Sequence, residues 1–536
     1  MRTYIRLVKK LMNKTLTVKQ VAALLLVFIG ILATVFVFSV SSSVQTVDGS
    51  VSKPRQAIIK SATYERPTDT TALGKLLAYV DSVSNAPELT GGTWAFYLCE
   101  LDRDTPVCEV EPDLGLIPAS VTKVVTTASA LTLLGPDYRF NTSLQYDGEI
   151  IKEKKTLNGN LIIQGYGDPT LGAETFGSSP EKVMDDFIAA IVKMGIDTVN
   201  GSIIADAESW DRDPVPSSWA WEDMQNDYGI APCGLNMREN AFDLLITPAG
   251  NKTLLKVHPE IPGLRLFNQV VVSGKISKPY AYVAGAPYQF NRVVIGEVAA
   301  AHQVKCAVPD PALFTAQLLK KHLEKNGVFV RDSAVTQRIL RLNGNNSSDK
   351  KSRKVLLSLN SPRLKDIVHH TNQVSHNFYA EAILRAIAWK KTGFGNTNAG
   401  IAEIYKLWKS KGLDLRGMNL TDGSGVSRFN TITVRQLVNM LKNIAKDNTV
   451  FPHFYQSLPV AGESGTIRKL ADGTAAEGNL HAKSGYMSRV RAYAGYVDSK
   501  SGKRMAFAMI GNNTLWDAVS MRDKFERLFV LMAELP

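Results

Sequence analysis

The feature that most constrains this chain is a run of twenty uncharged residues, 21–40, near its amino terminus. A single helix of that length crosses a bilayer core about 30 Å thick. Basic residues precede the run, and the first acidic residue is Asp48. Since basic flanks stay in the cytoplasm, the sequence predicts a cytoplasmic leader (1–20), a transmembrane signal anchor (21–40) and a polar linker (41–70) that leads to an exported body.

A cleaved signal peptide is the alternative to this anchor. The apolar region of a signal peptide usually spans roughly 7–15 residues and ends in an A-x-A-like site. Here the run is longer and ends in Ser41-Ser42-Ser43, so we favour the uncleaved anchor. Both alternatives export the body to the cell envelope, on the periplasmic face of the inner membrane or free in the periplasm.

The net charge of +12 does not indicate a nucleic-acid partner, because the leader carries half of it. The other half is spread over the remaining chain, which is weak support for any polyanion. No Cys/His spacing resembles a zinc site, and there is no His-Glu-x-x-His segment. We therefore expect no nucleic acid, no metal and no cofactor.

Export to an oxidising compartment makes the four cysteines candidates for disulfides. If Arg103-Asp104 is a turn, Cys99 and Cys108 face each other across a hairpin and can pair. Cys233 and Cys306 can pair within the middle of the chain. Four buried thiols are the alternative, and the sequence leaves both open.

The order of predicted elements indicates one domain interrupted by an insertion. A hairpin begins at Trp94, and an apolar helix follows Ser120. Helical patterns, two strands and a last helix close the chain, at about 363–412, 433–446, 491–497, 504–510 and 515–533. Because strands from both ends can share a sheet, we predict one domain from 71–140 and 355–536, with an inserted region at 141–354.

Ser120 and Lys123 form a candidate nucleophile and base at the start of the predicted helix. Residues three apart on a helix lie on one face, about one turn apart. A serine hydroxyl is a poor nucleophile until a base removes its proton. Burial and a nearby positive charge lower the pKa of a lysine, so that its amine can serve as this base. The helix amino terminus also offers the Ser120 N–H to a developing oxyanion.

Context separates this pair from its copies. Ser-x-x-Lys also occurs at Ser50/Lys53, Ser179/Lys182 and Ser347/Lys350. Those copies lie in the linker, in a Gly/Ser/Pro segment and in a polar loop, where a capped or solvated helix end explains them. Only Ser120 precedes an apolar helix that a core can hold rigid.

The carboxyl-terminal half supplies the further groups that such an enzyme needs. In Ser375-His376-Asn377, the Ser375 hydroxyl can relay a proton to a leaving amine, and the Asn377 amide can hold a peptide carbonyl. Lys483-Ser484-Gly485 precedes the strand pair: Lys483 can bind a carboxylate, Ser484 can assist, and Gly485 allows a substrate close to the strand. The same motif patterns also occur elsewhere. Ser358-Leu359-Asn360 falls in a strand-like stretch, and Lys500-Ser501-Gly502 falls in a turn.

These three motifs, in this order, resemble those of the penicillin-binding proteins and serine β-lactamases. The surrounding sequence resembles the class C low-molecular-mass penicillin-binding proteins, the D-alanyl-D-alanine carboxypeptidase/endopeptidase family called peptidase family S13. The further matching segments are Pro118–Ser120, Leu134–Phe140, Gly165–Leu171, Asp422–Arg428, Leu458–Gly462 and Gly465–Arg468. Ser484 where Thr is commoner and His376 where Asp is frequent depart from the pattern, but both leave the required groups in place.

The resemblance implies a mixed α/β fold. The expected core is a serine β-lactamase/transpeptidase-like domain, an antiparallel sheet flanked by helices, interrupted by a long inserted α/β and β-rich region. The implied function is serine-type cleavage of D-Ala-D-Ala peptides of peptidoglycan through a Ser120 acyl-enzyme, with β-lactams bound covalently at the same serine. Two alternatives are a β-lactamase and a catalytically inert penicillin-binding scaffold. Carboxypeptidase and endopeptidase activity are not separated by the sequence.

The resemblance also implies roles for residues around the motifs. The backbone N–H groups of Ser120 and Tyr486 would form the oxyanion hole. Arg428 and Asp206, with Trp210 nearby, would contact the polar end of a diaminopimelate side chain of the substrate.

Overall fold

The computed structural model describes residues 70–345 and 350–536. The predicted leader and anchor, and the linker up to residue 69, lie outside the described residues. Within the described ranges, no helix combines the length and the apolar character that a bilayer crossing needs.

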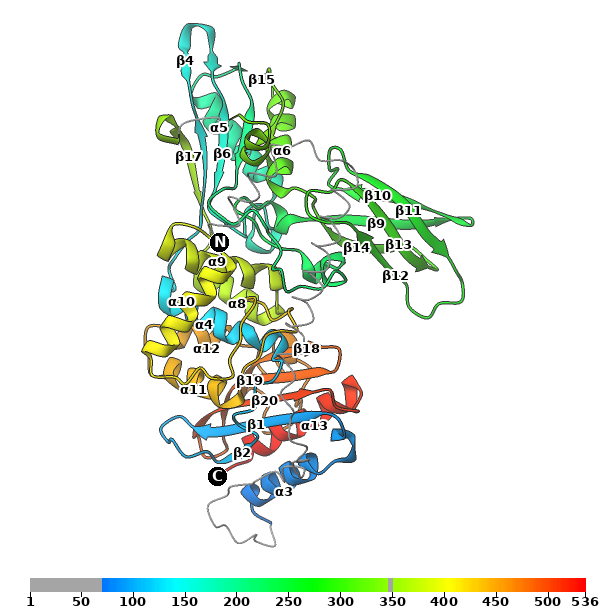
Figure 1. Cartoon of the computed structure of the whole chain (residues 1–536), viewed down its shortest axis with the longest axis vertical. Coiled ribbons are helices and arrows are strands. Elements are labelled where there is room, and N and C mark those ends of the chain that lie inside the picture. Colours follow the sequence, from blue (N-terminus) through cyan, green and yellow to red (C-terminus); the bar gives the residue numbers. More distant parts are fainter. Residues whose placement is uncertain (1–69, 346–349) are drawn as a thin grey trace, which may run out of the picture. The chain divides into compact units, whose positions relative to one another are not determined.

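One five-stranded antiparallel sheet joins the two ends of the described chain. Its order is β18 (Leu480–Met487), β19 (Val490–Asp498), β20 (Arg504–Asn512), β1 (Thr93–Glu100) and β2 (Cys108–Val110). β1 pairs with β20 along its whole length, from Thr93 opposite Asn512 to Glu100 opposite Met505. In Figure 1 the blue β1 accordingly lies beside the orange β20.

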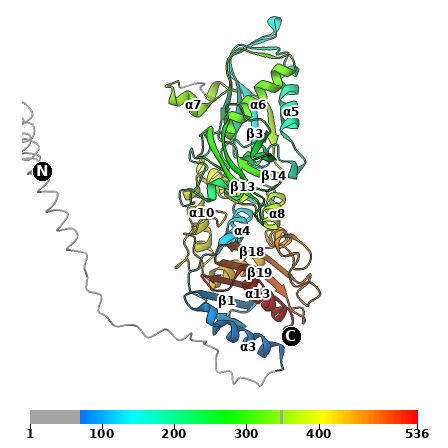
Figure 2. The same ribbon diagram turned by 90° about the vertical axis from the view of Figure 1, so that its right-hand side faces the viewer.

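Both faces of this sheet are covered, because alternate residues of each strand point to opposite faces. On β1, Phe96 and Leu98 join one apolar cluster, and Ala95 and Tyr97 join another. The first cluster includes residues of α3 (Ala72–Ser84) and α13 (Ala518–Ala533), which contact each other (Figure 2). The second cluster includes residues of α11 (Val434–Ala445).

A layer of helices contains the candidate nucleophile. α4 (Thr122–Leu134) is buried on every side over its first ten residues, 122–131, which is unusual for a helix unless it lies within a core. It contacts the helices around it, and in sequence order this layer includes α8 (Leu364–Val374), α9 (Asn377–Thr392), α10 (Thr397–Ser410), α11 and α12 (Phe451–Ser457). The expected mixed α/β fold is therefore confirmed.

The middle of the chain builds four further sheets. Their orders are β16-β8-β6-β3-β17, β15-β7-β5-β4, β10-β9-β14 and β11-β13-β12. The strands are β3 (Asn141–Tyr146), β4 (Glu149–Ile151), β5 (Thr156–Asn158), β6 (Leu161–Gly165), β7 (Thr198–Val199), β8 (Ile203–Asp206), β9 (Ala241–Ala249), β10 (Lys252–His258), β11 (Arg265–Val272), β12 (Tyr280–Ala284), β13 (Asn291–Val298), β14 (His302–Ala307), β15 (Phe329–Val330), β16 (Val335–Thr336) and β17 (Lys354–Asn360). The helices are α5 (Pro180–Lys193), α6 (Pro311–Lys325) and α7 (Gln337–Leu342).

β17 pairs with β3 and so belongs to a sheet of the middle region, although all of its residues except Lys354 follow the boundary predicted at 354/355. The division into 71–140, 141–354 and 355–536 stays a prediction.

The cysteines do not pair. The hairpin register sets Cys108 opposite Leu98 rather than opposite Cys99. A register shift of one residue turns a side chain to the other face of a sheet, so Cys99 and Cys108 belong to different apolar clusters. Cys233 and Cys306 are also free, and all four thiols are buried. Of the two alternatives that the sequence left open, the structure has the four buried thiols.

Candidate active site

Ser120 lies in a single turn of 3₁₀ helix, Ala119–Val121, directly before α4. Ala119 has a φ of 47°, a left-handed backbone conformation that an alanine rarely adopts and that functional sites often contain. Gly485 of β18 lies against this turn: a Cβ on it would be 2.5 Å from the Pro118 carbonyl oxygen and 3.2 Å from the Ser120 nitrogen. A glycine is therefore required where β18 passes the nucleophile.

Lys123 is fully buried beneath Ser120. Its Nζ lies 3.0 Å from Ser120 Oγ, 2.6 Å from Asn377 Oδ1 and 2.6 Å from the Ser424 carbonyl oxygen. Burial lowers the pKa of Lys123 to about 7, against the opposing effect of nearby carboxylates. A large fraction of this amine is therefore neutral at physiological pH and can accept the proton of Ser120.

The second motif forms the junction between α8 and α9. Ser375 ends α8 with a φ of 61°, His376 caps α9, and Asn377 is the first residue of α9. The Asn377 Nδ2 donates to the Tyr228 carbonyl at 2.9 Å, which turns Oδ1 towards Lys123. Burial lowers the pKa of His376 to about 4, so this ring is neutral near pH 7.

Lys483 connects the third motif to the second. It is fully buried on β18, and its Nζ donates to Ser375 Oγ at 2.9 Å and to the Ser484 carbonyl at 2.6 Å. Burial first, and then the charge of Lys123, hold the pKa of Lys483 well below its usual value. The structure thus brings the five predicted catalytic residues into two hydrogen-bonded groups, Ser120–Lys123–Asn377 and Ser375–Lys483.

Ser484 and Tyr486 of β18 are less buried than Lys483 and Gly485. Ser484 Oγ donates to Thr466 Oγ1 at 2.7 Å, which links β18 to the Gly465–Arg468 segment. The Tyr486 side chain is exposed, with the Arg491 guanidinium 4.5 Å from its ring centroid.

Arg428 and Asp206, which the resemblance assigns to the same substrate group, form ion pairs with different residues. Arg428 forms ion pairs with Glu222 at 2.9 Å and Asp223 at 3.4 Å. Asp206 is fully buried and forms an ion pair with Arg353 at 2.8 Å. A substrate contact from Asp206 would require opening this internal pair.

Trp210 lines a different cavity from the catalytic motifs. A cavity of about 630 Å³ is lined by Ser375, His376 and Asn377 together with Tyr228 and Glu239. Trp210 is buried in the wall of another cavity, of about 890 Å³, whose lining contains none of the five catalytic candidates.

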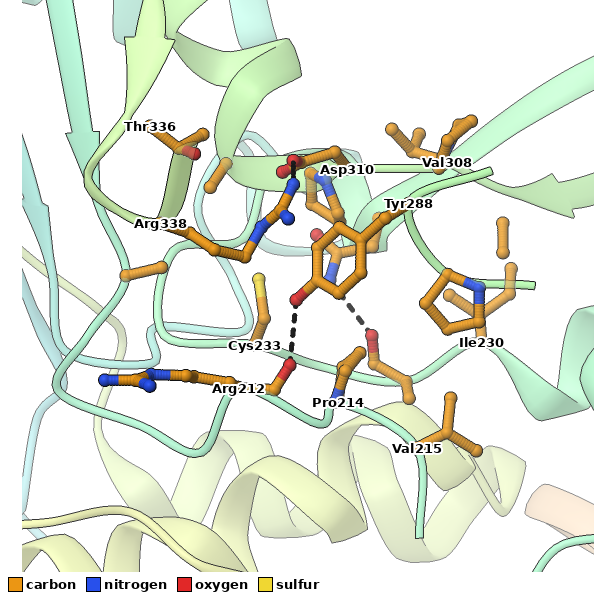
Figure 3. A pocket seen from close by; sticks show the side chains of 18 of the residues that line it. Arg212, Pro214, Val215, Ile230, Cys233, Tyr288, Val308, Asp310, Thr336 and Arg338 are labelled. Atoms are coloured by element: carbon orange, nitrogen blue, oxygen red, sulfur yellow. Dashed lines mark hydrogen bonds and ion pairs between the residues drawn. The ribbon is translucent and has the colours of Figure 1, made fainter. Parts of the chain in front are cut away.

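The Trp210 cavity lies wholly in the middle region. Figure 3 shows the Tyr288 ring between Arg338 and the segment with Arg212 and Pro214. Tyr288 donates to the Arg212 carbonyl at 2.9 Å, and the Arg338 guanidinium lies 3.8 Å from the centre of the ring. The Trp210 cavity therefore lies apart from the catalytic motifs, whereas Ser375 and Asn377 of the second motif line the other cavity.

Several contact residues of the site were missed by the sequence analysis. Glu381 and Asp422 are buried carboxylates beneath Lys123, and Tyr228 offers its carbonyl to Asn377. The position of Glu381, four residues after Asn377 on one helix, is a signal that could have found it. Nothing in the local sequence indicates the Tyr228 carbonyl, because that contact depends on the tertiary fold.

Comparison with known proteins decides the family. The profile of the D-Ala-D-Ala carboxypeptidase 3 (S13) family matches residues 76–535, nearly all of the described chain. The chain belongs to this family. The S13 family that the motifs predicted is therefore confirmed, and with it the class of enzyme, a serine D-Ala-D-Ala carboxypeptidase.

Curated S13 relatives match over most of their length. A D-alanyl-D-alanine carboxypeptidase from Actinomadura sp. (strain R39) is 28% identical over 473 residues, which cover 84% of each chain. The D-alanyl-D-alanine carboxypeptidase DacB of Haemophilus influenzae is 24% identical and covers 81% of this chain and 87% of its own.

A solved structure of a penicillin-binding protein has the same fold. The crystal structure of penicillin binding protein 4 (dacB) from Haemophilus influenzae superposes with a TM-score of 0.73 at 22% identity, over 85% of this chain and 97% of that one. The same protein complexed with a β-lactam gives a TM-score of 0.68.

Proposed function

We propose that this S13 peptidase cleaves the terminal D-Ala-D-Ala bond of peptidoglycan stem peptides through an acyl-enzyme on Ser120. The substrate carboxylate binds beside Lys483 and Ser484. Lys123 takes the Ser120 proton, and Ser120 Oγ attacks the carbonyl of the penultimate D-Ala. The N–H groups of Ser120 and Tyr486 stabilise the oxyanion, each contributing about 10²–10³ in rate.

The observation that carries this proposal is the 3.0 Å contact between Ser120 Oγ and a fully buried Lys123 whose pKa is lowered to about 7. A neutral amine at that distance is within reach of the hydroxyl proton. Ser375, held by Lys483 at 2.9 Å, is the candidate that passes a proton to the departing amine. Water then hydrolyses the ester and frees Ser120.

Release of D-Ala tests the proposal. The soluble body is incubated with a stem pentapeptide and with a crosslinked stem dimer, which separate carboxypeptidase from endopeptidase activity. Ser120→Ala should abolish both activities. Ser179→Ala is the matched control, because Ser179 belongs to another Ser-x-x-Lys but caps α5. Equal turnover by the parent and Ser120→Ala would refute the proposal, as would a parent without turnover.

β-Lactams should acylate the same serine. The D-Ala-D-Ala-like amide of a penicillin meets the same nucleophile, and the fold is shared with a penicillin-binding protein solved with a β-lactam. A stable covalent label from a fluorescent penicillin supports the peptidase. Consumption of the antibiotic without a stable label would favour the β-lactamase alternative. If the antibiotic is neither bound nor consumed, the inert scaffold is favoured.

We further propose that Arg428 with Asp223, rather than with Asp206, recognises the charged end of a diaminopimelate side chain. An amino acid terminus carries both charges, and this pair offers a guanidinium and a carboxylate 3.4 Å apart. Arg428→Ala should raise the KM for a diaminopimelate peptide more than for a lysine peptide. An equal effect on both peptides would refute this subsite.

The protein acts in the cell envelope, where peptidoglycan lies. We propose that residues 21–40 retain it in the inner membrane; the support is their length and apolar character and the basic leader before them. Membrane fractionation of the full chain and of a chain starting near residue 45 tests this, because only the full chain should sediment with membranes.

A further inference from the structure

Glu381 is a buried carboxylate that the mechanism above does not use. It lies on α9, one turn after Asn377, with no exposed surface. Its Oε1 accepts hydrogen bonds from the backbone N–H groups of Gly423 at 2.9 Å and Ser424 at 2.8 Å. The carbonyl of the same Ser424 accepts from Lys123 Nζ at 2.6 Å. One residue of backbone therefore joins the Glu381 carboxylate to the Lys123 amine.

The other carboxylate oxygen of Glu381 lacks a hydrogen bond. Among the residues that the structure describes, its Oε2 is buried and has no hydrogen-bond partner. Arg385 lies one turn further along α9, but its guanidinium donates to the carbonyls of Pro214 and Pro232 and to Thr397 Oγ1. A buried anion without enough donors is costly, which indicates that this carboxylate has a function beyond packing.

The second carboxylate near Lys123 is differently placed. Asp422 is buried and accepts four hydrogen bonds, from Gly425 N, Ser427 N, Asn430 Nδ2 and Trp219 Nε1. Those donors already stabilise its charge. Of the two carboxylates that act on Lys123, Glu381 is thus the one with an oxygen left to respond to a new positive charge.

We propose that Glu381 is a positioning residue for the base: it fixes the Ser424 carbonyl against the Lys123 amine and stabilises the ammonium that forms when Lys123 takes the Ser120 proton. This inference rests on the proposed role of Lys123. In this step one proton moves from Ser120 Oγ to Lys123 Nζ, a bond forms between Oγ and the carbonyl carbon while the carbonyl π electron pair moves onto its oxygen, and Glu381 neither gains nor loses a proton.

Other ionisable groups face the pair. Asp422 is a buried carboxylate, burial lowers the pKa of His376 to about 4, and burial and the charge of Lys123 hold the pKa of Lys483 well below its usual value. Burial and Asp422 raise the pKa of Glu381 to about 7, which hydrogen bonds from Ser424 and the charge of Arg385 oppose, so Glu381 ionises over the same pH range as Lys123. An anion at Glu381 favours the charged form of Lys123, so removing it must lower the pKa of Lys123.

The pH dependence of Ser120 acylation tests this role. A fluorescent penicillin is mixed with the parent and with Glu381→Gln, which keeps the shape and an acceptor oxygen but removes the charge. In the parent the rate rises with pH as Lys123 deprotonates. In Glu381→Gln the midpoint of that rise should fall by about one pH unit, and the plateau rate should fall about tenfold because the ammonium is less stabilised.

The matched control is Glu324→Gln on α6, which removes a half-exposed carboxylate paired with Lys320 and should leave both midpoint and plateau unchanged. A Glu381→Gln midpoint equal to that of the parent overturns the proposal, even if the plateau falls, because a structural role lowers the rate without moving the midpoint. A parent that acquires no label refutes the proposed function instead.

Glu381→Asp keeps the test decisive if Glu381→Gln does not fold. Aspartate keeps the charge but is one methylene shorter, so it withdraws the oxygen from the N–H groups of Gly423 and Ser424. The plateau rate should fall about tenfold with the midpoint within a few tenths of a pH unit of the parent value. A rate profile identical to that of the parent would overturn the positioning role.

Discussion

At the scale of single residues, Ser375 is placed to move a proton rather than to attack. It ends α8 in a left-handed conformation, and its Oγ accepts a hydrogen bond from Lys483 Nζ at 2.9 Å. Lys483 in turn is fully buried, whereas Ser375 lines the cavity, so the pair offers an accessible hydroxyl that a buried amine holds in place.

Ser375→Ala should therefore slow cleavage of a stem pentapeptide by about 10²–10⁴ while leaving the protein folded. The control is Ser358→Ala, in a Ser-x-Asn segment of β17 where the hydroxyl only accepts from Asn141. The release of D-Ala in single-turnover kinetics measures the cleavage rates of both variants. A Ser375→Ala rate within a factor of a few of the parent would exclude the proton relay.

The sequence predicted the residues of the three motifs but not all of their contacts. Residue types and order identify Ser120, Lys123 and Lys483, because their chemistry is restrictive. The ion pair of Arg428 with Asp223 depends on which distant loop reaches Arg428, and no local pattern encodes that. The i, i+4 spacing from Asn377 could have placed Glu381 beside the site, but not shown its partners Gly423 and Ser424, which come from another segment.

At the scale of elements, the strand β18 and the turn before α4 fit together through Gly485. A side chain at this position would press on the backbone of Pro118 and Ser120, which cannot move aside as a flexible side chain can. The N–H groups of Ser120 and Tyr486, which we propose as the oxyanion hole, lie on these two elements, so the separation of the two groups depends on this contact.

Gly485→Ala should reduce acylation by a fluorescent penicillin at least about tenfold and lower the melting temperature. Gly274→Ala is the control, because a Cβ there meets nothing within 4 Å. Stopped-flow acylation and thermal unfolding measure the two effects. Normal acylation by Gly485→Ala would show that β18 and the turn adjust freely.

Several elements of the carboxyl-terminal half were predicted close to their observed bounds. The two strands and the last helix expected at 491–497, 504–510 and 515–533 correspond to β19, β20 and α13. The helical pattern at 363–412 becomes three helices, because Ser375 and Gly393 take left-handed conformations that end a helix. The sequence did not indicate that Cys108 lies opposite Leu98 rather than Cys99, because hairpin register depends on loop length and turn type.

At the scale of the whole described body, the middle region contributes directly to the active site. The Tyr228 carbonyl orients Asn377, and Trp219 Nε1 donates to Asp422 Oδ2 at 2.9 Å in a buried contact. These contacts tie the middle region to the helices that carry Lys123, so we expect the middle region to stabilise the catalytic helices during unfolding.

Trp219→Phe should lower the free energy of unfolding by about 1–3 kcal/mol, because a buried carboxylate loses a donor. Trp221→Phe, two residues away at an exposed position, is the matched control and should change it by less than about 0.5 kcal/mol. Urea unfolding followed by circular dichroism measures both. Equal stabilities of the two variants would show that the Asp422 contact carries no energy.

The most direct test of the central claim is mass spectrometry of the body after reaction with a penicillin. We expect one added acyl group, carried by the peptide that contains Ser120, and no such adduct in Ser120→Ala. An adduct on another residue, or one that persists in Ser120→Ala, would contradict Ser120 as the nucleophile.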